Sequence, residues 1–229
     1  MERVPRKVLL IPGLFYPRWM LLPLRYTLRK KGFEAEIWDT TGVAAPLPKI
    51  VAELVDAIRG FASPARQPDG IAWQPDGIAR QPDGIARQPA GVSLVTHSFG
   101  DWLARAALAE IDGDGERPSG VDRIVSLVPV IAQSPAAQLA APLFGRWLPP
   151  LEAMSDPKRA AQGLPLPAGI ERKIIWARGD LLLRRAPPQT DARTREVYLW
   201  TTHNLLLADP RVHRMVGEFL RDPQPCQKH

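Results

Sequence analysis

Val92-Ser93-Leu94-Val95-Thr96-His97-Ser98-Phe99-Gly100 is the stretch of this 229-residue sequence that decides the fold. The β-branched and apolar residues 92–95 predict a buried strand, and a helical pattern follows over residues 102–109. Gly100, two places after Ser98, is typical of the tight turn between such a strand and helix. This arrangement would hold the Ser98 hydroxyl clear of the backbone. It would also point the unpaired N–H groups of the helix N-terminus at an oxyanion formed there, so Ser98 is a candidate nucleophile.

Strand and helix patterns alternate along the rest of the chain. Strands are predicted at residues 7–11, 33–38, 121–128, 172–177 and 196–200, and helices at residues 18–31, 47–61 and 210–220. This alternation predicts an α/β fold: a mostly parallel central sheet with helices on both faces, in a single domain of residues 1–229.

Composition narrows the function class. Hydrophobic residues make up 45% of the chain and charged residues 24%, which is ordinary for a soluble globular protein. The formal net charge is +6, but the basic residues are scattered and form no nucleic-acid motif, so we expect no nucleic-acid partner. A mildly basic surface instead favours anionic interfaces. The single cysteine, Cys226, allows neither an intramolecular disulfide nor a thiolate metal cluster.

The N-terminus superficially resembles a signal peptide, because Arg3, Arg6 and Lys7 precede an apolar run. Pro12 and Gly13 interrupt that run after four residues, so we interpret it as the first core strand. Since no stretch approaches the length needed to span a bilayer, a cytoplasmic location is expected.

Two segments interrupt the alternation. Residues 66–91 contain the tandem repeat Gln-Pro-Asp-Gly-Ile-Ala-Arg/Trp, whose proline and glycine in every unit exclude a coiled coil. We interpret this segment as a flexible loop insertion, with an interaction segment as the alternative. Residues 129–169 are rich in proline and alanine and carry Leu143, Phe144 and Trp147. They predict either an apolar lid over an active site or a helical pair that completes the core.

The sequence at Thr96-His97-Ser98-Phe99-Gly100 resembles the G-x-S-x-G nucleophile elbow of the α/β-hydrolases, and the chain is similar to their small lipase/esterase branch. Further matching blocks lie at residues 9–14, 126–129, 174–180 and 203–206, so the resemblance extends over residues 7–220. It implies the α/β-hydrolase fold, with a catalytic serine, acid and histidine in that chain order.

Among the four histidines, His203 is the expected general base, because it follows an apolar strand at the sheet edge where catalytic groups collect. A capping or surface histidine is the alternative there. His97 lies inside the elbow and is expected to be structural, whereas His213 lies in the last helix pattern and His229 ends the chain.

The acid that orients the base is expected to be Asp180, which follows Gly179 at a strand end. Asp191 is the second candidate, and Asp209 is expected to cap the helix that begins at Pro210. The backbone N–H groups of Phe99 and, by the resemblance, of Leu14 are the expected oxyanion hole.

Three residues depart from the family pattern. Thr96 replaces the first glycine of the elbow, Asp101 stands where another glycine often follows, and Pro12 stands where the oxyanion loop often has histidine. The first two weaken the elbow assignment, and the third suggests a differently braced oxyanion loop.

The predicted function is hydrolysis of carboxylic esters through an acyl-enzyme on Ser98. The expected substrate is a small acyl ester or lipid, with peripheral membrane contact left open and no cofactor or metal ion. The alternatives are a catalytically degenerate binding or scaffold protein and, among enzymes, a thioesterase or amidase.

Overall fold

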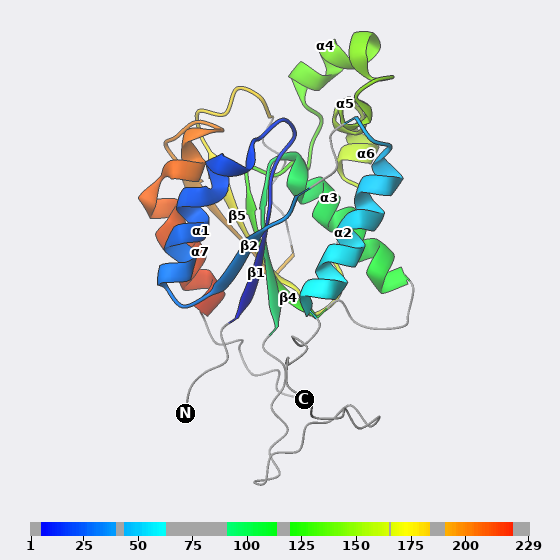
Figure 1. Ribbon diagram of the computed structural model, residues 1–229. Coiled ribbons are helices and arrows are strands. Elements are labelled where there is room, and N and C mark those ends of the chain that lie inside the picture. Colours follow the sequence, from blue (N-terminus) through cyan, green and yellow to red (C-terminus); the bar gives the residue numbers. More distant parts are fainter. Residues whose placement is uncertain are drawn as a thin grey trace, which may run out of the picture.

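The strands form one parallel sheet in the computed structural model, which describes residues 6–39, 44–62, 91–113, 120–164, 166–183 and 191–221 (Figure 1). The strand order is β2-β1-β3-β4-β5-β6, and every pair is parallel. The strands are β1 Lys7–Ile11, β2 Glu34–Ile37, β3 Val92–His97, β4 Val121–Leu127, β5 Glu171–Ala177 and β6 Thr194–Leu199. The predicted mostly parallel sheet is therefore confirmed.

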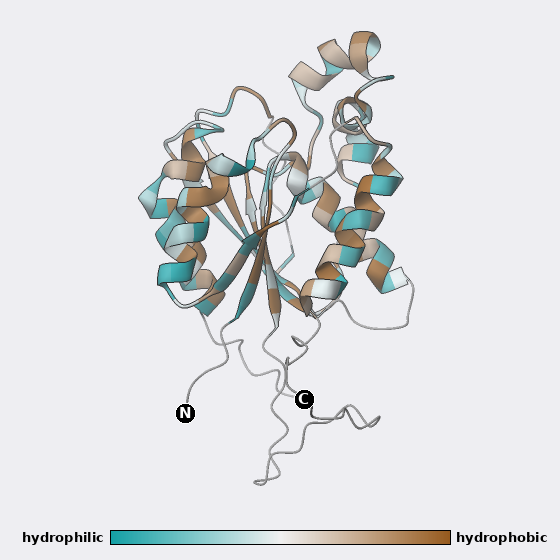
Figure 2. Ribbon diagram, in the orientation of Figure 1, coloured by the Kyte–Doolittle hydropathy of each residue, from teal (hydrophilic) through white to brown (hydrophobic). Residues whose placement is uncertain are grey.

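Helices cover both faces of this sheet (Figures 1 and 2). One face carries α1 (Leu22–Lys30) and α7 (Pro210–Arg221), and the other carries α2 (Leu47–Ala62) and α3 (Phe99–Gly113). Neighbouring residues of β3 point into different cores: Leu94 packs with α2 and α3, and Val95 with α1 and α7. All six residues of β3 are buried, so both faces of this strand are covered, as is typical of a central strand in a parallel sheet.

Most element boundaries lie within two residues of the predicted ones, with two exceptions. The predicted helix at 18–31 is divided into a 3-10 helix, η1 (Arg18–Leu21), and α1, which has Pro23 in its first turn. Helix α3 begins at Phe99, directly after Ser98, and not at residue 102. A second 3-10 helix, η2 (Leu205–Ala208), leads into α7.

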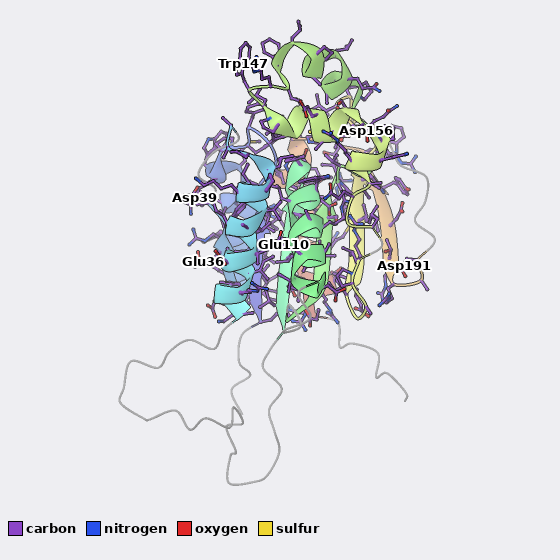
Figure 3. All side chains as sticks on the ribbon, turned by 90° about the vertical axis from the view of Figure 1, so that its right-hand side faces the viewer. Glu36, Asp39, Glu110, Trp147, Asp156 and Asp191 are labelled. Carbon is purple, nitrogen blue, oxygen red and sulfur yellow. The ribbon has the colours of Figure 1, made fainter. Side chains whose placement is uncertain are left out.

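The segment 129–169 contains three short helices above the carboxyl ends of the strands: α4 (Pro135–Phe144), α5 (Pro149–Ser155) and α6 (Pro157–Ala160) (Figures 1 and 3). A proline starts each of them, which accounts for part of the proline content of the segment. Helices α5 and α6 contribute to the core, whereas the described part of α4 buries only Ala137. The segment thus combines core helices with a projecting helix.

The tandem repeat lies outside the described residues except for Gly91, as do Cys226 and His229. The predictions made for them stay predictions.

Candidate active site

Ser98 occupies the sharp turn between β3 and α3. Its φ of 52° lies in the left-handed region, which costs a non-glycine residue about 1–2 kcal/mol. Three backbone hydrogen bonds hold it there: its N–H donates to the Leu127 carbonyl at 2.9 Å, and its carbonyl accepts from the N–H groups of Asp101 at 3.1 Å and Val130 at 3.4 Å. A strained serine on a strand-to-helix turn has the geometry of a nucleophile elbow.

Two glycines allow the loop after β1 to approach this turn. A Cβ atom on Gly100 would lie 2.4 Å from the Pro12 carbonyl oxygen, and one on Gly13 would lie 2.9 Å from the Ser98 Cβ. Only glycine fits such contacts, so the start of α3 and the loop after β1 pack backbone to backbone. Pro12 stands where the oxyanion loop of the α/β-hydrolases often has histidine, and its carbonyl oxygen is the atom closest to the position of a Cβ on Gly100.

Strained backbone is concentrated at the edge of the sheet formed by the carboxyl ends of the strands. Among the described non-glycine residues, positive φ is confined to Phe15 (60°), Ser98 (52°) and Val128 (44°). They follow the carboxyl ends of β1, β3 and β4, respectively. The strand order reverses its direction of growth beside β1, which is where open α/β sheets bind ligands. Strain of this kind is typical of functional sites.

Asp180 and His203 are brought together from two different loops. His203 Nδ1 lies 2.6 Å from Asp180 Oδ2, and both side chains are almost completely buried. The other carboxylate oxygen accepts the N–H groups of Leu182 (2.8 Å) and Leu183 (3.0 Å). Burial raises the pKa of Asp180, but the hydrogen bonds from His203 and the two N–H groups outweigh it and leave the pKa below its usual range. An ionised carboxylate therefore faces the imidazole.

The second contact of such a triad, between the serine hydroxyl and the histidine, is not a hydrogen bond in this structure. Ser98 Oγ has no hydrogen-bond partner among the described residues, although hydrogen bonds of this kind often tighten only once substrate is bound. The neighbouring residue His97 instead contacts the loop after β6 that carries His203, which we call the histidine loop. The ring centroids of His97 and His203 are 4.9 Å apart.

His97 is completely buried beneath the histidine loop. Its Nε2 lies 3.3 Å from the His203 carbonyl, and its ring meets Tyr16 edge-on at 4.5 Å between centroids. Burial and the neighbouring His203 lower the pKa of His97 to about 3, so the ring is neutral at physiological pH. The expected structural role of His97 fits these contacts, which support the loop that carries His203.

Tyr16 and Asn204 are two site residues that the sequence reasoning missed. The Tyr16 hydroxyl donates to Asn204 Oδ1, and the Tyr16 ring lies 5.9 Å from the His203 ring. Burial, and then the charge of Asp180, raise the pKa of Tyr16, so the hydroxyl remains a donor. These residues are 188 positions apart, so no local sequence pattern predicts their contact.

The two other aspartates considered from the sequence do not pair with His203. Asp191 precedes β6, at the opposite edge of the sheet, and caps the turn there by accepting the Arg193 N–H at 3.1 Å. Asp209 accepts the Arg211 N–H at 2.8 Å at the start of α7, in agreement with the capping role expected for it. The structure therefore brings Asp180, and neither alternative, to His203.

The two unusual elbow residues are partners of each other. The Thr96 hydroxyl donates to Asp101 Oδ1 at 3.2 Å, and the Ser126 hydroxyl donates to the same oxygen at 2.5 Å. Arg105 and Arg172 each pair with the Asp101 carboxylate at 2.9 Å. Burial raises the pKa of Asp101, but the two arginines more than offset this and keep it below its usual value. We call these five residues the buried ion cluster.

Arg105 connects this cluster to the segment 129–169. Its guanidinium donates to the carbonyls of Val130 (2.6 Å), Ala160 (2.9 Å) and Gln162. A Cβ atom on Gly163, whose φ is +74°, would come within 2.9 Å of the Arg105 backbone. Helix α3 therefore holds both the elbow and the base of the segment above it.

An apolar cavity of about 260 Å³ opens beside the elbow. Its walls come from the loop after β1, the ends of β2, α2 and α3, and one residue of α5. They are Pro12, Gly13, Leu14, Phe15, Tyr16, Pro17, Trp38, Ile50, Phe99, Leu103 and Pro150. Leu14 and Phe99, the residues expected to supply the oxyanion hole, both line it. None of these described lining residues has a charged side chain, so the cavity suits an apolar group.

Within the described ranges, no group of three or more His, Cys, Asp or Glu side chains could hold a metal ion. None of the helices described is long and apolar enough to cross a bilayer.

Neither protein-family models nor curated protein sequences match this chain. Solved structures do. A structure from the work on LipS and LipT, two metagenome-derived lipolytic enzymes, aligns with a TM-score of 0.65 at 15% identity over 94% of this chain and 93% of that one. The chain has the α/β-hydrolase fold.

Other solved structures agree on this α/β-hydrolase fold. A soluble variant of monoglyceride lipase from Saccharomyces cerevisiae aligns with a TM-score of 0.62 at 14% identity, over 96% of this chain and 87% of that chain. Lipase B of Aspergillus fumigatus aligns with a TM-score of 0.64 at 13% identity over 95% of this chain. The chain spans about half the length of two of these structures: 53% of that lipase and 49% of the metagenomic carboxyl esterase MGS0156.

Proposed function

We propose that this α/β-hydrolase cleaves carboxylic esters through an acyl-enzyme on Ser98. The Ser98 Oγ attacks the acyl carbonyl carbon while His203 Nε2 takes its proton, and the carbonyl electrons move to the oxygen. Collapse of this intermediate expels the alcohol, which leaves with the proton from His203. Water then attacks the acyl-enzyme with the same proton transfers and releases the acid.

The observation that carries this proposal is the 2.6 Å contact between His203 Nδ1 and Asp180, beside a serine held at positive φ. The carboxylate would fix the tautomer of His203 with Nε2 free to accept a proton, and would stabilise the imidazolium that forms. The backbone N–H groups of Leu14 and Phe99 would donate to the oxyanion.

The apolar cavity supports an acyl substrate over a sugar or a phosphate, because it would leave polar substrate groups without partners. Burying each methylene contributes about 0.8 kcal/mol. We therefore expect kcat/KM to rise by up to about fourfold per added methylene until the chain fills the cavity. Thioesters and amides would use the same residues, and comparing leaving groups distinguishes among them.

The test is labelling by a fluorophosphonate probe, together with rates on aryl esters of increasing acyl length. Wild-type protein should be labelled and active, and Ser98→Ala should show neither property. Asp180→Asn should lose about 10⁴-fold in kcat. Ser155→Ala is the matched control, because Ser155 is partly exposed and, among the described residues, its hydroxyl donates to the Glu152 carbonyl and not to the candidate site. A folded wild-type protein that takes no label would instead support the scaffold alternative.

A further inference from the structure

Three exposed tryptophans stand on separate connections at the carboxyl edge of the sheet, where the candidate active site lies. Trp19 follows β1, Trp147 follows β4 and α4, and Trp200 follows β6, and each is about two-thirds exposed or more. The carboxyl ends of parallel strands meet at one edge, so these side chains belong to one face of the molecule. Trp147 lies near the end of the molecule where the helices of segment 129–169 project (Figure 3).

Each tryptophan has an arginine beside it. Arg18 precedes Trp19 and Arg146 precedes Trp147 in the sequence. The third pair is made in space: the Arg178 guanidinium lies 5.2 Å from the centre of the Trp200 ring. Arginine and tryptophan together suit a boundary between lipid headgroups and acyl chains, because Trp rings partition there and guanidinium groups bind phosphate.

Helix α4 adds an apolar surface without a protein partner in the described structure. Leu139 and Leu143 are 81% and 70% exposed, and Phe144 is about half exposed. The helix is nevertheless fixed at its base, since Ser134 caps it and donates to the Leu182 carbonyl at 2.8 Å. Monomeric proteins rarely expose an apolar surface of this kind unless it meets a partner or a membrane.

The charges on this face favour an anionic partner. Residues 135–148 contain no acidic residue and one arginine, Arg146. Of the acidic residues that follow the strands here, Asp180 is buried against His203, and Asp39, which follows β2, is paired with Arg18 at 2.7 Å. The acidic residues labelled in Figure 3 all lie further than Trp147 from the projecting end of the molecule.

We propose that this face docks on an anionic phospholipid membrane, with α4 and the three tryptophans in the interface and Arg146 and Arg178 against lipid phosphates. This goes beyond the proposed ester hydrolysis and does not depend on it. A second copy of the chain is a poorer occupant, because two such faces would oppose their arginines. Docking would turn the mouth of the candidate site toward the membrane.

Co-sedimentation with vesicles tests the docking, using the full chain with Ser98→Ala so that turnover plays no part. We expect binding to vesicles of phosphatidylcholine mixed with phosphatidylglycerol, weaker binding to phosphatidylcholine alone, and loss of the difference in high salt. Leu143→Ser with Trp147→Ser should reduce partitioning at least tenfold. Arg146→Gln and Arg178→Gln should each reduce it about fivefold.

Arg59→Gln is the matched control, because Arg59 lies near the end of α2, at the opposite edge of the sheet, and this variant should bind as the parent does. The same leucine, tryptophan and arginine substitutions are also made with Ser98 intact. Their hydrolysis of a water-soluble short-chain ester should stay within about twofold of wild type, which separates docking from catalysis. Absence of vesicle binding, or binding unchanged by Trp147→Ser, would overturn the proposal. So would a dimer in analytical ultracentrifugation that the same substitutions abolish.

Discussion

His97 shows how a residue next to the candidate nucleophile can serve the site without touching substrate. It lies between Tyr16 and the backbone of His203, in a position that leaves its ring no access to water. The energetic consequence is that the folded protein excludes a proton that the unfolded chain accepts.

This exclusion predicts a pH dependence of stability. The unfolded pKa of a histidine is about 6.5 and that of folded His97 is about 3, so the unfolded state binds more protons between these values. Stability is therefore fully present above about pH 6.5 and falls by up to about 1.4 kcal/mol per unit as the pH drops.

The measurement is urea unfolding between pH 7 and pH 5.5, where carboxylate protonation contributes little. His97→Asn should be less stable than wild type at pH 7 and should show a shallower pH dependence. Parallel curves for the two proteins would show that the proton is not excluded at His97.

The single residues of the site differ in how far sequence could predict them. Ser98, Asp180 and His203 each follow an apolar strand, so local pattern and chain order were enough to select them. Thr96 and Asp101 could be seen only as departures, because the partners that explain Asp101 include Ser126 and Arg172, 25 and 71 positions away. Tertiary contacts of this kind leave no trace in local periodicity.

At the scale of elements, α3 joins the two halves of the site. Its first turn forms the elbow, and Asp101 and Arg105 lie one turn apart on the side that faces the sheet. Through Arg105 the same helix holds the carbonyls of Val130, Ala160 and Gln162. The buried guanidinium thus holds the end of α6 and the residues on either side of the segment that contains α5, which contributes Pro150 to the cavity.

Two leucine substitutions separate this role of Arg105 from charge pairing alone. Arg105→Leu and Arg172→Leu each leave Asp101 with one arginine, but only the first also leaves three carbonyl groups without their donor. Each unsatisfied buried acceptor costs about 1–3 kcal/mol. We expect Arg105→Leu to lower the free energy of unfolding by about 3–5 kcal/mol and Arg172→Leu to lower it by less. Chemical denaturation measures both, and equal losses would contradict the role of the carbonyl contacts.

The elements themselves were predictable where they are long and periodic. The strands and the helices α2 and α7 follow directly from apolar spacing. The three helices of segment 129–169 were not resolved individually, because they are short and α4 buries so little that it has no apolar stripe facing the core. The start of α3 at Phe99 depends on the strained turn at Ser98, which residue preferences oppose.

At the scale of the whole molecule, the sheet has two functionally different edges. The candidate active site and the exposed tryptophans lie at the carboxyl edge. The two points where the repeat-bearing segment leaves and rejoins the described chain, Ala62 and Gly91, lie at the amino edge. They are near each other: Lys7 pairs with Val92 in the sheet, and its Nζ bonds the Phe61 carbonyl at 3.0 Å.

Deletion of residues 66–87 tests the independence of these edges. The six residues left between Ala62 and Gly91 can span up to about 20 Å, which is enough for two neighbouring attachment points. We expect an unchanged circular dichroism spectrum, a stability within about 1 kcal/mol of wild type and unchanged ester hydrolysis. Lost hydrolysis in a folded deletion protein would show that the repeat acts on the site.

The proximity of Ala62 and Val92 also has a consequence for the history of the gene. Each repeat unit is a whole number of codons, so gain or loss of a unit keeps the reading frame. Because both ends of the segment are anchored at the edge away from the candidate active site, such changes would alter neither the elbow nor its cavity. The number of repeat units can then differ between closely related proteins that share the same chemistry. Such differences would distinguish recently diverged sequences in which the candidate catalytic residues are identical.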